Sequence, residues 1–114
     1  MSDCIFCRII KGDIPAKKVY EDDEMLAFYD INPASPVHCL VIPKKHIESL
    51  FELELEDASL AGRLLHKAQE LAKEQGCGEK GARFVINAGK DGGQTVNHLH
   101  IHVLGGRALK WPPG

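Results

Sequence analysis

The sequence lacks an excess of positive charge, an apolar run of membrane-spanning length, internal repeats and low-complexity segments. Its formal net charge is −2, whereas general nucleic-acid binders are usually basic. A membrane helix needs about 20 consecutive apolar residues. Lys11 and Asp13 follow the first apolar residues too soon for a signal peptide. We therefore expect a cytoplasmic protein with neither nucleic acid nor membrane as a partner.

The chain has 114 residues, which fits one domain of ordinary size, and we predict a single domain over residues 1–114. Four cysteines are present. In a reducing compartment they are more often thiols or metal ligands than disulfides. Cys4 and Cys7 form a Cys-x-x-Cys pair, whereas Cys39 and Cys77 have no partner pattern and are interpreted as packing or surface thiols.

Hydrophobic periodicity predicts two helices and five strands. Residues 4–10 have helical spacing before Gly12, and residues 56–75 form the main helix, which ends at Gly76. Strands are expected at residues 17–21, 25–29, 37–42, 83–87 and 98–103. Because the connections between neighbouring strands are short, antiparallel pairing is expected, and the predicted class is α+β.

The last predicted strand carries His98, His100 and His102, three of the six histidines of the chain. Residues at i, i+2 and i+4 of a strand share a face. The three imidazoles should therefore point one way, and Leu99 and Ile101 the other way, into a core. Because histidine is not a typical strand residue, this row indicates a site.

Three readings of the histidine row remain open from the residues alone. The rings could be hydrogen-bonded on a sheet face, or they could chelate a metal ion, as strand histidines at i and i+2 can. They could also perform acid–base or nucleophilic catalysis on a phosphate ester or amide. The glycine-rich stretch at residues 89–94 favours catalysis, because its backbone N–H groups could hold an anion. The pair Gly92-Gly93 within this stretch is also typical of a plain hairpin turn, which is the more usual interpretation of two adjacent glycines.

The row His98-Leu99-His100-Ile101-His102-Val103-Leu104 resembles the signature of the histidine triad (HIT) family. Residues 28–33, 38–46, 91–94 and 105–107 and the ending Trp111-Pro112-Pro113-Gly114 are similar to the Hint branch of that family. The resemblance implies a HIT fold with a five-stranded antiparallel sheet, one long helix and a short N-terminal helix. It also implies a homodimer in which two sheets join into one of ten strands.

The activity that the resemblance implies is hydrolysis of purine nucleoside 5′-phosphoramidates to a nucleoside monophosphate and an amine. His100 would be the nucleophile that forms a nucleotidyl-histidine intermediate, and a nearby imidazolium could protonate the amine. His38, His98 and His102 would complete the catalytic set. Catalysis itself is expected to need no cofactor.

The nucleotide site implied by the resemblance combines apolar, acidic and phosphate-binding residues. Asp30 would hold the ribose hydroxyls, and Trp111 would reach the active site of the partner subunit. The full predicted set is Phe6, Ile9, Ile14, Phe28, Asp30, Ile31, Asn87, Gly93, Gln94, Thr95, Val96, His100, His102 and Trp111.

The Cys-x-x-Cys pair is similar to that of bacterial histidine triad proteins that bind structural zinc. By that likeness the ligands would be Cys4, Cys7, His46 and His98, and a Cys2His2 set suits tetrahedral zinc. His98 would then be committed to the metal and would not act as an acid. Packing of a short helix and a redox pair remain the alternatives for the two cysteines.

Two other functions stay open at this stage. One is cleavage of dinucleoside polyphosphates, as in the Fhit branch of the same superfamily. The other is a nucleotide-binding regulatory protein that has lost its catalytic role.

Overall fold

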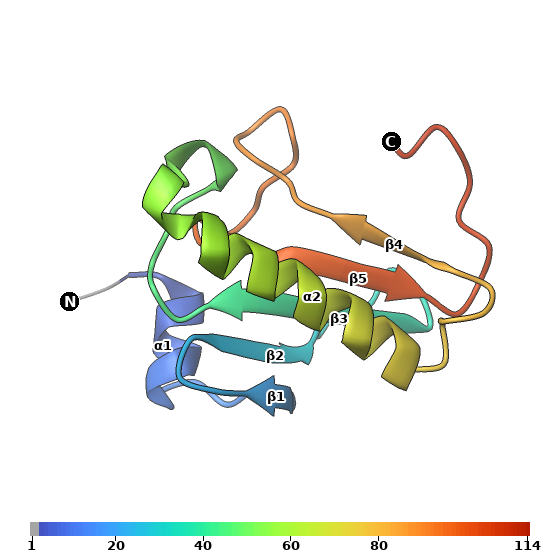
Figure 1. Ribbon diagram of the computed structural model, residues 1–114, viewed down its shortest axis with the longest axis horizontal. Helices are drawn as coiled ribbons and strands as arrows, with labels where there is room; N and C mark the ends of the chain where they lie inside the picture. Colours follow the sequence, from blue (N-terminus) through green and yellow to red (C-terminus); the bar gives the residue numbers. More distant parts are fainter. Residues whose placement is uncertain (1–2) are drawn as a thin grey trace.

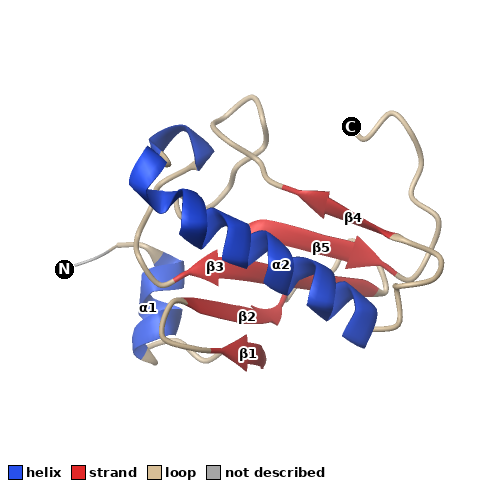
Figure 2. Cartoon of the chain, in the orientation of Figure 1, coloured by secondary structure: helices blue, strands red, loops and turns tan. Residues whose placement is uncertain are grey.

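Five antiparallel strands form one sheet in the order β1-β2-β3-β5-β4 in the computed structural model, which describes residues 3–114 (Figure 1). The elements are α1 (Ile5–Lys11), β1 (Lys18–Glu21), β2 (Met25–Tyr29), β3 (Val37–Pro43), α2 (Ala58–Glu74), β4 (Ala82–Val85) and β5 (Ile101–Gly105). The predicted α+β class, with one long helix and a short N-terminal one, is confirmed (Figure 2). The first two residues of the predicted domain lie outside the described range.

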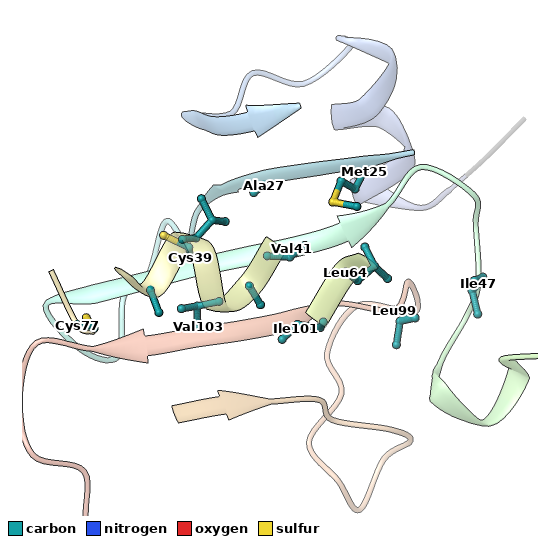
Figure 3. Close-up of a cluster of buried hydrophobic side chains, with 13 residues drawn as sticks. Met25, Ala27, Cys39, Val41, Ile47, Leu64, Cys77, Leu99, Ile101 and Val103 are labelled. Atoms are coloured by element: carbon teal, nitrogen blue, oxygen red, sulfur yellow. The ribbon is translucent and has the colours of Figure 1, made fainter. Parts of the chain in front are cut away.

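Strand alternation divides the apolar side chains into two clusters, one on each face of the sheet. The α2 face receives Met25, Ala27, Cys39, Val41, Ile101 and Val103, which pack with buried residues of α2 (Figure 3). The opposite face receives Leu26, Phe28, Leu40 and Ile42, which pack with Phe6 and Ile9 of α1. The two helices therefore cover opposite faces, and Cys39 and Cys77 are core residues.

The main helix is slightly shorter than the predicted range 56–75. Two 3-10 turns, η1 (Leu50–Glu52) and η2 (Leu55–Asp57), precede α2. The Asp57 carboxylate accepts from the backbone N–H of Glu54 at 3.1 Å. Beyond the helix Gly76 adopts φ +88°, a left-handed conformation that favours glycine. Within residues 3–114 no helix is long and apolar enough to cross a membrane.

The histidine-rich segment enters the sheet later than the sequence predicts, because β5 begins at Ile101 and not at His98. Ile101 is opposite Val41, so an extended ladder would set residue 99 opposite Pro43. Proline has no N–H to donate. The N–H of Leu99 instead donates to the carbonyl of Ile47 at 2.7 Å. The predicted alternation of side chains persists, because Leu99 packs in the core on the α2 face.

The N-terminal helix α1 has seven residues and is capped at both ends. The Cys4 sulfur accepts from the N–H of Cys7 at 3.3 Å. Gly12, at φ +88°, donates its N–H to the carbonyls of Arg8 and Ile9 and ends the helix. These caps place the two cysteines at one end of α1, beside the segment that leads into β5.

Candidate active site

An apolar cavity of about 260 Å³ lies where α1, β2, β3 and the segment before β5 meet. Its lining is Ile5, Phe6, Ile9, Ile14, Pro15, Ala16, Phe28, Tyr29, Asp30, Ile31, Leu40, Thr95, Val96, His100 and His102. The structure thus brings together most of the nucleotide-binding residues predicted from the sequence. It leaves Asn87, Gly93, Gln94 and Trp111 outside the lining.

His100 is buried and presents one defined ring nitrogen to this cavity. Its Nδ1 lies 2.7 Å from the carbonyl oxygen of His98. A carbonyl only accepts hydrogen bonds, so Nδ1 carries the proton and donates. Nε2 of the neutral ring therefore keeps its lone pair. His100 thus has the tautomer that a nucleophile at Nε2 requires.

The tautomer of His102 follows from a chain of two hydrogen bonds. The backbone N–H of Ala34 donates to Nδ1 of His38 at 2.9 Å, so the neutral His38 ring carries its proton on Nε2. That nitrogen lies 2.9 Å from Nδ1 of His102 and donates to it. His102 consequently carries its proton on Nε2. The two rings are diagonal neighbours across β3 and β5, because His38 is opposite Leu104 and His102 is opposite Leu40.

Burial keeps both of these rings neutral near pH 7. It lowers the pKa of His38 more strongly than the nearby Asp30 carboxylate raises it. Burial, together with His100 and His38, lowers the pKa of His102 to about 4. Neither ring is the imidazolium that the sequence suggests as a proton donor. His102 is instead a neutral N–H donor.

Asp30 follows β2 at the rim of the cavity. One carboxylate oxygen accepts from the N–H of Asn32 at 2.8 Å, which fixes the turn after the strand. The other lies 3.4 Å from Nε2 of His38. The carboxylate is partly exposed and can accept hydrogen bonds from a ligand beside the apolar wall. Asp30, His38 and His102 also lie close enough together to bind a cation, although His38 Nε2 already donates to His102.

Gln94 stabilises the glycine-rich turn through its whole side-chain amide. Its carbonyl oxygen accepts from the N–H of Gly89 at 2.9 Å, and its amide nitrogen donates to the carbonyls of Glu48 and Val96 at 2.7 and 2.9 Å. Gly93 adopts φ +86°, which few other residues tolerate. This turn places Thr95 and Val96 at the cavity. In the single chain the Gln94 side chain therefore stabilises the turn and does not line the cavity.

Asn87 and Trp111 were predicted from the resemblance, but neither lines the cavity. Asn87 follows β4 and is partly buried. Trp111 is 81% exposed in the C-terminal tail, which Arg83 holds through hydrogen bonds to the carbonyls of Leu109 and Lys110.

Four donor atoms converge beside α1, and we term Cys4, Cys7, His46 and His98 the Cys/His cluster. The Cys4 sulfur lies 3.3 Å from Nδ1 of His98, and the Cys7 sulfur lies 3.2 Å from Nδ1 of His46. The two Nδ1 atoms are 3.2 Å apart. All four donor atoms lie within 4.8 Å of one another. The structure thus brings together the four ligands predicted for zinc.

The donor set fits a tetrahedral ion. Zinc bonds of about 2.3 Å to sulfur and about 2.0 Å to nitrogen set neighbouring ligand atoms about 3.3–3.7 Å apart. The contacts of 3.2–3.5 Å in the cluster are close to that range. The ring of His98 supports the fit, because its Nε2 donates to the Pro43 carbonyl at 2.8 Å and leaves the lone pair on Nδ1.

His98 was predicted both as a catalytic residue and as a metal ligand, and its geometry favours the second role. The side chain is completely buried, and both ring nitrogens have partners outside the cavity. Burial lowers its pKa to about 4, so the ring is in the neutral form that metals require. What His98 contributes at the cavity is its backbone carbonyl, which orients His100.

Five lining residues escaped the sequence analysis: Ile5, Pro15, Ala16, Tyr29 and Leu40. Leu40 was detectable, because strand alternation sets it on the same face as His38. Pro15 and Ala16 carry no such signal, since they reach the cavity through the path of the loop after α1. A second hollow, mainly polar, adjoins the cavity and shares Ile5, Thr95 and Val96 with it.

The family model described as the HIT domain matches residues 11–109. An uncharacterised HIT-like protein of Synechocystis is 54% identical over 112 residues, which cover 98% of this chain and 97% of that protein. The crystal structure of a HIT family hydrolase from Legionella pneumophila superposes with a TM-score of 0.97 at 47% identity, covering 98% of this chain and 100% of that one. A histidine triad protein from Clostridium difficile gives a TM-score of 0.92 at 46% identity, with 96% of each chain covered.

Proposed function

The chain belongs to the HIT family, and on this premise we propose that it is a purine nucleoside 5′-phosphoramidate hydrolase of the Hint branch. The observation that carries the proposal is the pair of complementary tautomers at one cavity. His100 presents a lone pair and His102 presents an N–H. The similarity to proteins named HIT family hydrolases supports a hydrolytic reaction.

The apolar cavity suits a purine base. Phe6 and Ile9 of α1 and Phe28 of β2 form walls on which a flat ring can pack. Ile14 and Ile31 extend this surface, and the Asp30 carboxylate at the rim accepts hydrogen bonds from the two ribose hydroxyls. The nucleoside then enters with its 5′ end toward His100 and His102.

In the proposed reaction, Nε2 of His100 attacks the α-phosphorus as the bond between phosphorus and the amine breaks. The Nδ1–H of His100 stays hydrogen-bonded to the His98 carbonyl, which stabilises the positive charge that develops on the ring. Water then attacks the nucleotidyl-histidine, releases the nucleoside monophosphate and restores neutral His100. The two steps together consume one water molecule.

His102 and Thr95 act on the phosphate and on the leaving group. The Nε2–H of His102 donates to a phosphate oxygen, and His38 keeps the proton on that nitrogen. Thr95 lines both the apolar cavity and the polar hollow, so its hydroxyl can relay a proton from solvent water to the departing amine, and the water that hydrolyses the intermediate returns that proton. The backbone of Gly93 and Val96 contributes to the phosphate site, and the side-chain hydrogen bonds of Gln94 stabilise the turn between them.

We assign the Cys/His cluster to structural zinc. A bound ion would link the N-terminus of α1 to the loop after β3 and to the segment before β5, and it would supply no step of the reaction. Metal analysis of protein purified without a histidine tag tests this assignment. About one zinc per chain is expected, and less than about 0.2 per chain would reject the assignment.

We further propose that the single HIT domain of residues 1–114 forms a homodimer with a ten-stranded sheet. The edge strand β4 supports this, because its Phe84 side chain is 42% exposed and its outer edge can pair with a second copy. In that dimer Trp111, and Asn87 beside β4, would approach the active sites.

Steady-state hydrolysis of an adenosine 5′-phosphoramidate that carries a fluorescent amine tests the activity. We expect turnover that falls at least about 10⁴-fold in His100→Ala. His66→Ala, an exposed histidine of α2, is the matched control and should retain full activity. Faster cleavage of diadenosine tetraphosphate would assign the protein to the dinucleotide branch. Binding of AMP without turnover of either compound would favour the regulatory function.

A further inference from the structure

We propose that metal binding at the Cys/His cluster and nucleotide binding in the apolar cavity strengthen each other through α1. The inference rests on the proposed function and adds a regulatory link to it. The cluster then determines how tightly the nucleotide binds, although none of its sulfur atoms lines the apolar cavity.

One short helix carries residues of both sites. Cys4 and Cys7, at the start of α1, contact the imidazoles of His98 and His46 at 3.3 and 3.2 Å. Phe6, between them in sequence, is buried and lines the cavity. A displacement of α1 that separated the cysteines from the histidines would therefore also move the cavity wall.

The position of α1 depends on its contacts with the rest of the chain. The helix has seven residues, and isolated helices shorter than about 12–15 residues are marginal in water. One set of contacts is apolar, in which the Phe6 ring packs edge-on against Phe28 with centroids 5.5 Å apart. The other set is the Cys/His cluster. Ordering of the cluster should therefore order the helix.

His98 provides a second connection between the two sites. Its ring belongs to the cluster, while its carbonyl oxygen accepts from Nδ1 of His100 at 2.7 Å. The Phe6 ring lies edge-on to both imidazoles, with centroids 5.9 Å from His98 and 5.2 Å from His100. Phe6 thus contacts one ring of the cluster and one ring of the cavity.

Two ligands that order the same element bind with positive cooperativity. The first ligand bears the entropic cost of ordering α1, so the second binds to a helix already in place. The coupling between two binding equilibria is reciprocal. Coupling free energies commonly correspond to factors of about 5–150, and we expect a factor of about ten here because only one short helix is involved.

Calorimetry of AMP binding to the untagged full chain, once loaded with zinc and once stripped by a chelator, measures one side of the coupling. Zinc affinity from chelator competition, with and without saturating AMP, measures the other. We expect AMP to bind about tenfold more weakly to the stripped protein and to raise zinc affinity by the same factor. Equal AMP affinities in the loaded and stripped protein would overturn the proposal.

Two phenylalanine variants test whether the coupling passes through α1. Phe6→Ala removes the ring that touches both sites, whereas Phe28→Ala removes a wall of the same cavity that belongs to β2. Both should weaken AMP binding, but only Phe6→Ala should make zinc affinity insensitive to AMP. Because Phe28 is buried like Phe6, Phe28→Ala also controls for a general loss of stability in the stripped chain. Equal coupling in both variants would overturn the role of α1.

The outcomes separate this inference from the proposed function. If the protein hydrolyses the phosphoramidate but its AMP affinity is independent of bound zinc, that result would contradict the coupling alone. A protein that binds no zinc but remains active would reject both the zinc assignment and the coupling. Coupled binding of AMP and zinc without phosphoramidate turnover would contradict the hydrolase proposal and leave the coupling in place.

Discussion

Nε2 of His38 donates to Nδ1 of His102 across 2.9 Å, and this hydrogen bond determines which nitrogen of His102 carries a proton. Both residues belong to neighbouring strands of the sheet, but the direction of the bond is determined by the loop before β3, where the Ala34 N–H donates to His38. A main-chain donor thereby directs an N–H of His102 toward the cavity.

Replacement of His38 should impair catalysis more than binding. His38→Leu removes the donor to His102, and leaving one partner of a buried hydrogen bond unsatisfied costs about 1–3 kcal/mol, which corresponds to a fall of about 5- to 160-fold in kcat. His38→Gln can still place an N–H near His102 and should retain most of the activity. Steady-state kinetics with the fluorescent phosphoramidate measure both variants. Equal losses in the two would contradict the role of the donated proton.

The depressed pKa of His102 should make the fold sensitive to acid. The pKa of an unfolded histidine is about 6.5, whereas the pKa of His102 in the fold is about 4. Between these values the unfolded chain binds a proton that the folded chain does not, so the free energy of unfolding decreases as the pH falls.

We expect this contribution to be about 1–2 kcal/mol after allowance for solvent screening of a partly exposed ring. Urea titrations of the wild type and of His102→Gln at pH 7 and pH 4.5 measure it. The wild type should lose more stability between the two pH values than the variant does. Parallel losses would show that His102 does not contribute.

Gly105 and Cys77 form a close contact in the core that should couple their substitutions. A Cβ atom added at Gly105 would overlap the Cys77 sulfur. Gly105→Ala should therefore lower the free energy of unfolding by about 1–3 kcal/mol, the usual cost of overpacking. The double variant with Cys77→Ala should recover part of that loss in urea titrations. Additive losses would contradict the contact.

Trp111 is the only tryptophan of the chain, so its fluorescence reports on the C-terminal tail alone. In one copy the side chain is 81% exposed, which predicts red-shifted emission for a monomer. If the tail reaches a partner subunit, emission should shift to the blue at concentrations where sedimentation detects a dimer. Trp111→Phe should still dimerise but lose the signal. Emission that stays unchanged while the dimer forms would place Trp111 in solvent.

Much of the fold was predictable because its signals are local. The apolar runs at residues 25–29 and 37–42 predicted two strands, and Gly12 and Gly76 marked the ends of both helices. The start of β5 was wrong by three residues, because Pro43 on a different strand prevents the ladder from extending to His98. Local periodicity contains no information on the hydrogen-bonding capacity of a partner strand.

The candidate site was predictable to a different degree. The histidine row identified it, and the family resemblance supplied most of the cavity lining and the four residues of the Cys/His cluster. The function of Gln94 within its turn was not predictable, since the carbonyl of Glu48, which accepts from it, is 46 residues away in sequence. Residues such as Pro15 joined the cavity only through the path of a loop.

The sequence by itself determined which chemical groups are available and on which face of the sheet they lie, because alternation along a strand is a property of the backbone. Only the tertiary structure decided what each imidazole can do. His98, His100 and His102 are the same residue in one alternating row, yet their partners are the Pro43 carbonyl, the His98 carbonyl and the His38 ring. Because a neutral imidazole donates from one nitrogen and accepts at the other, these partners make Nδ1 the donor of His100 and Nε2 the donor of His98 and His102.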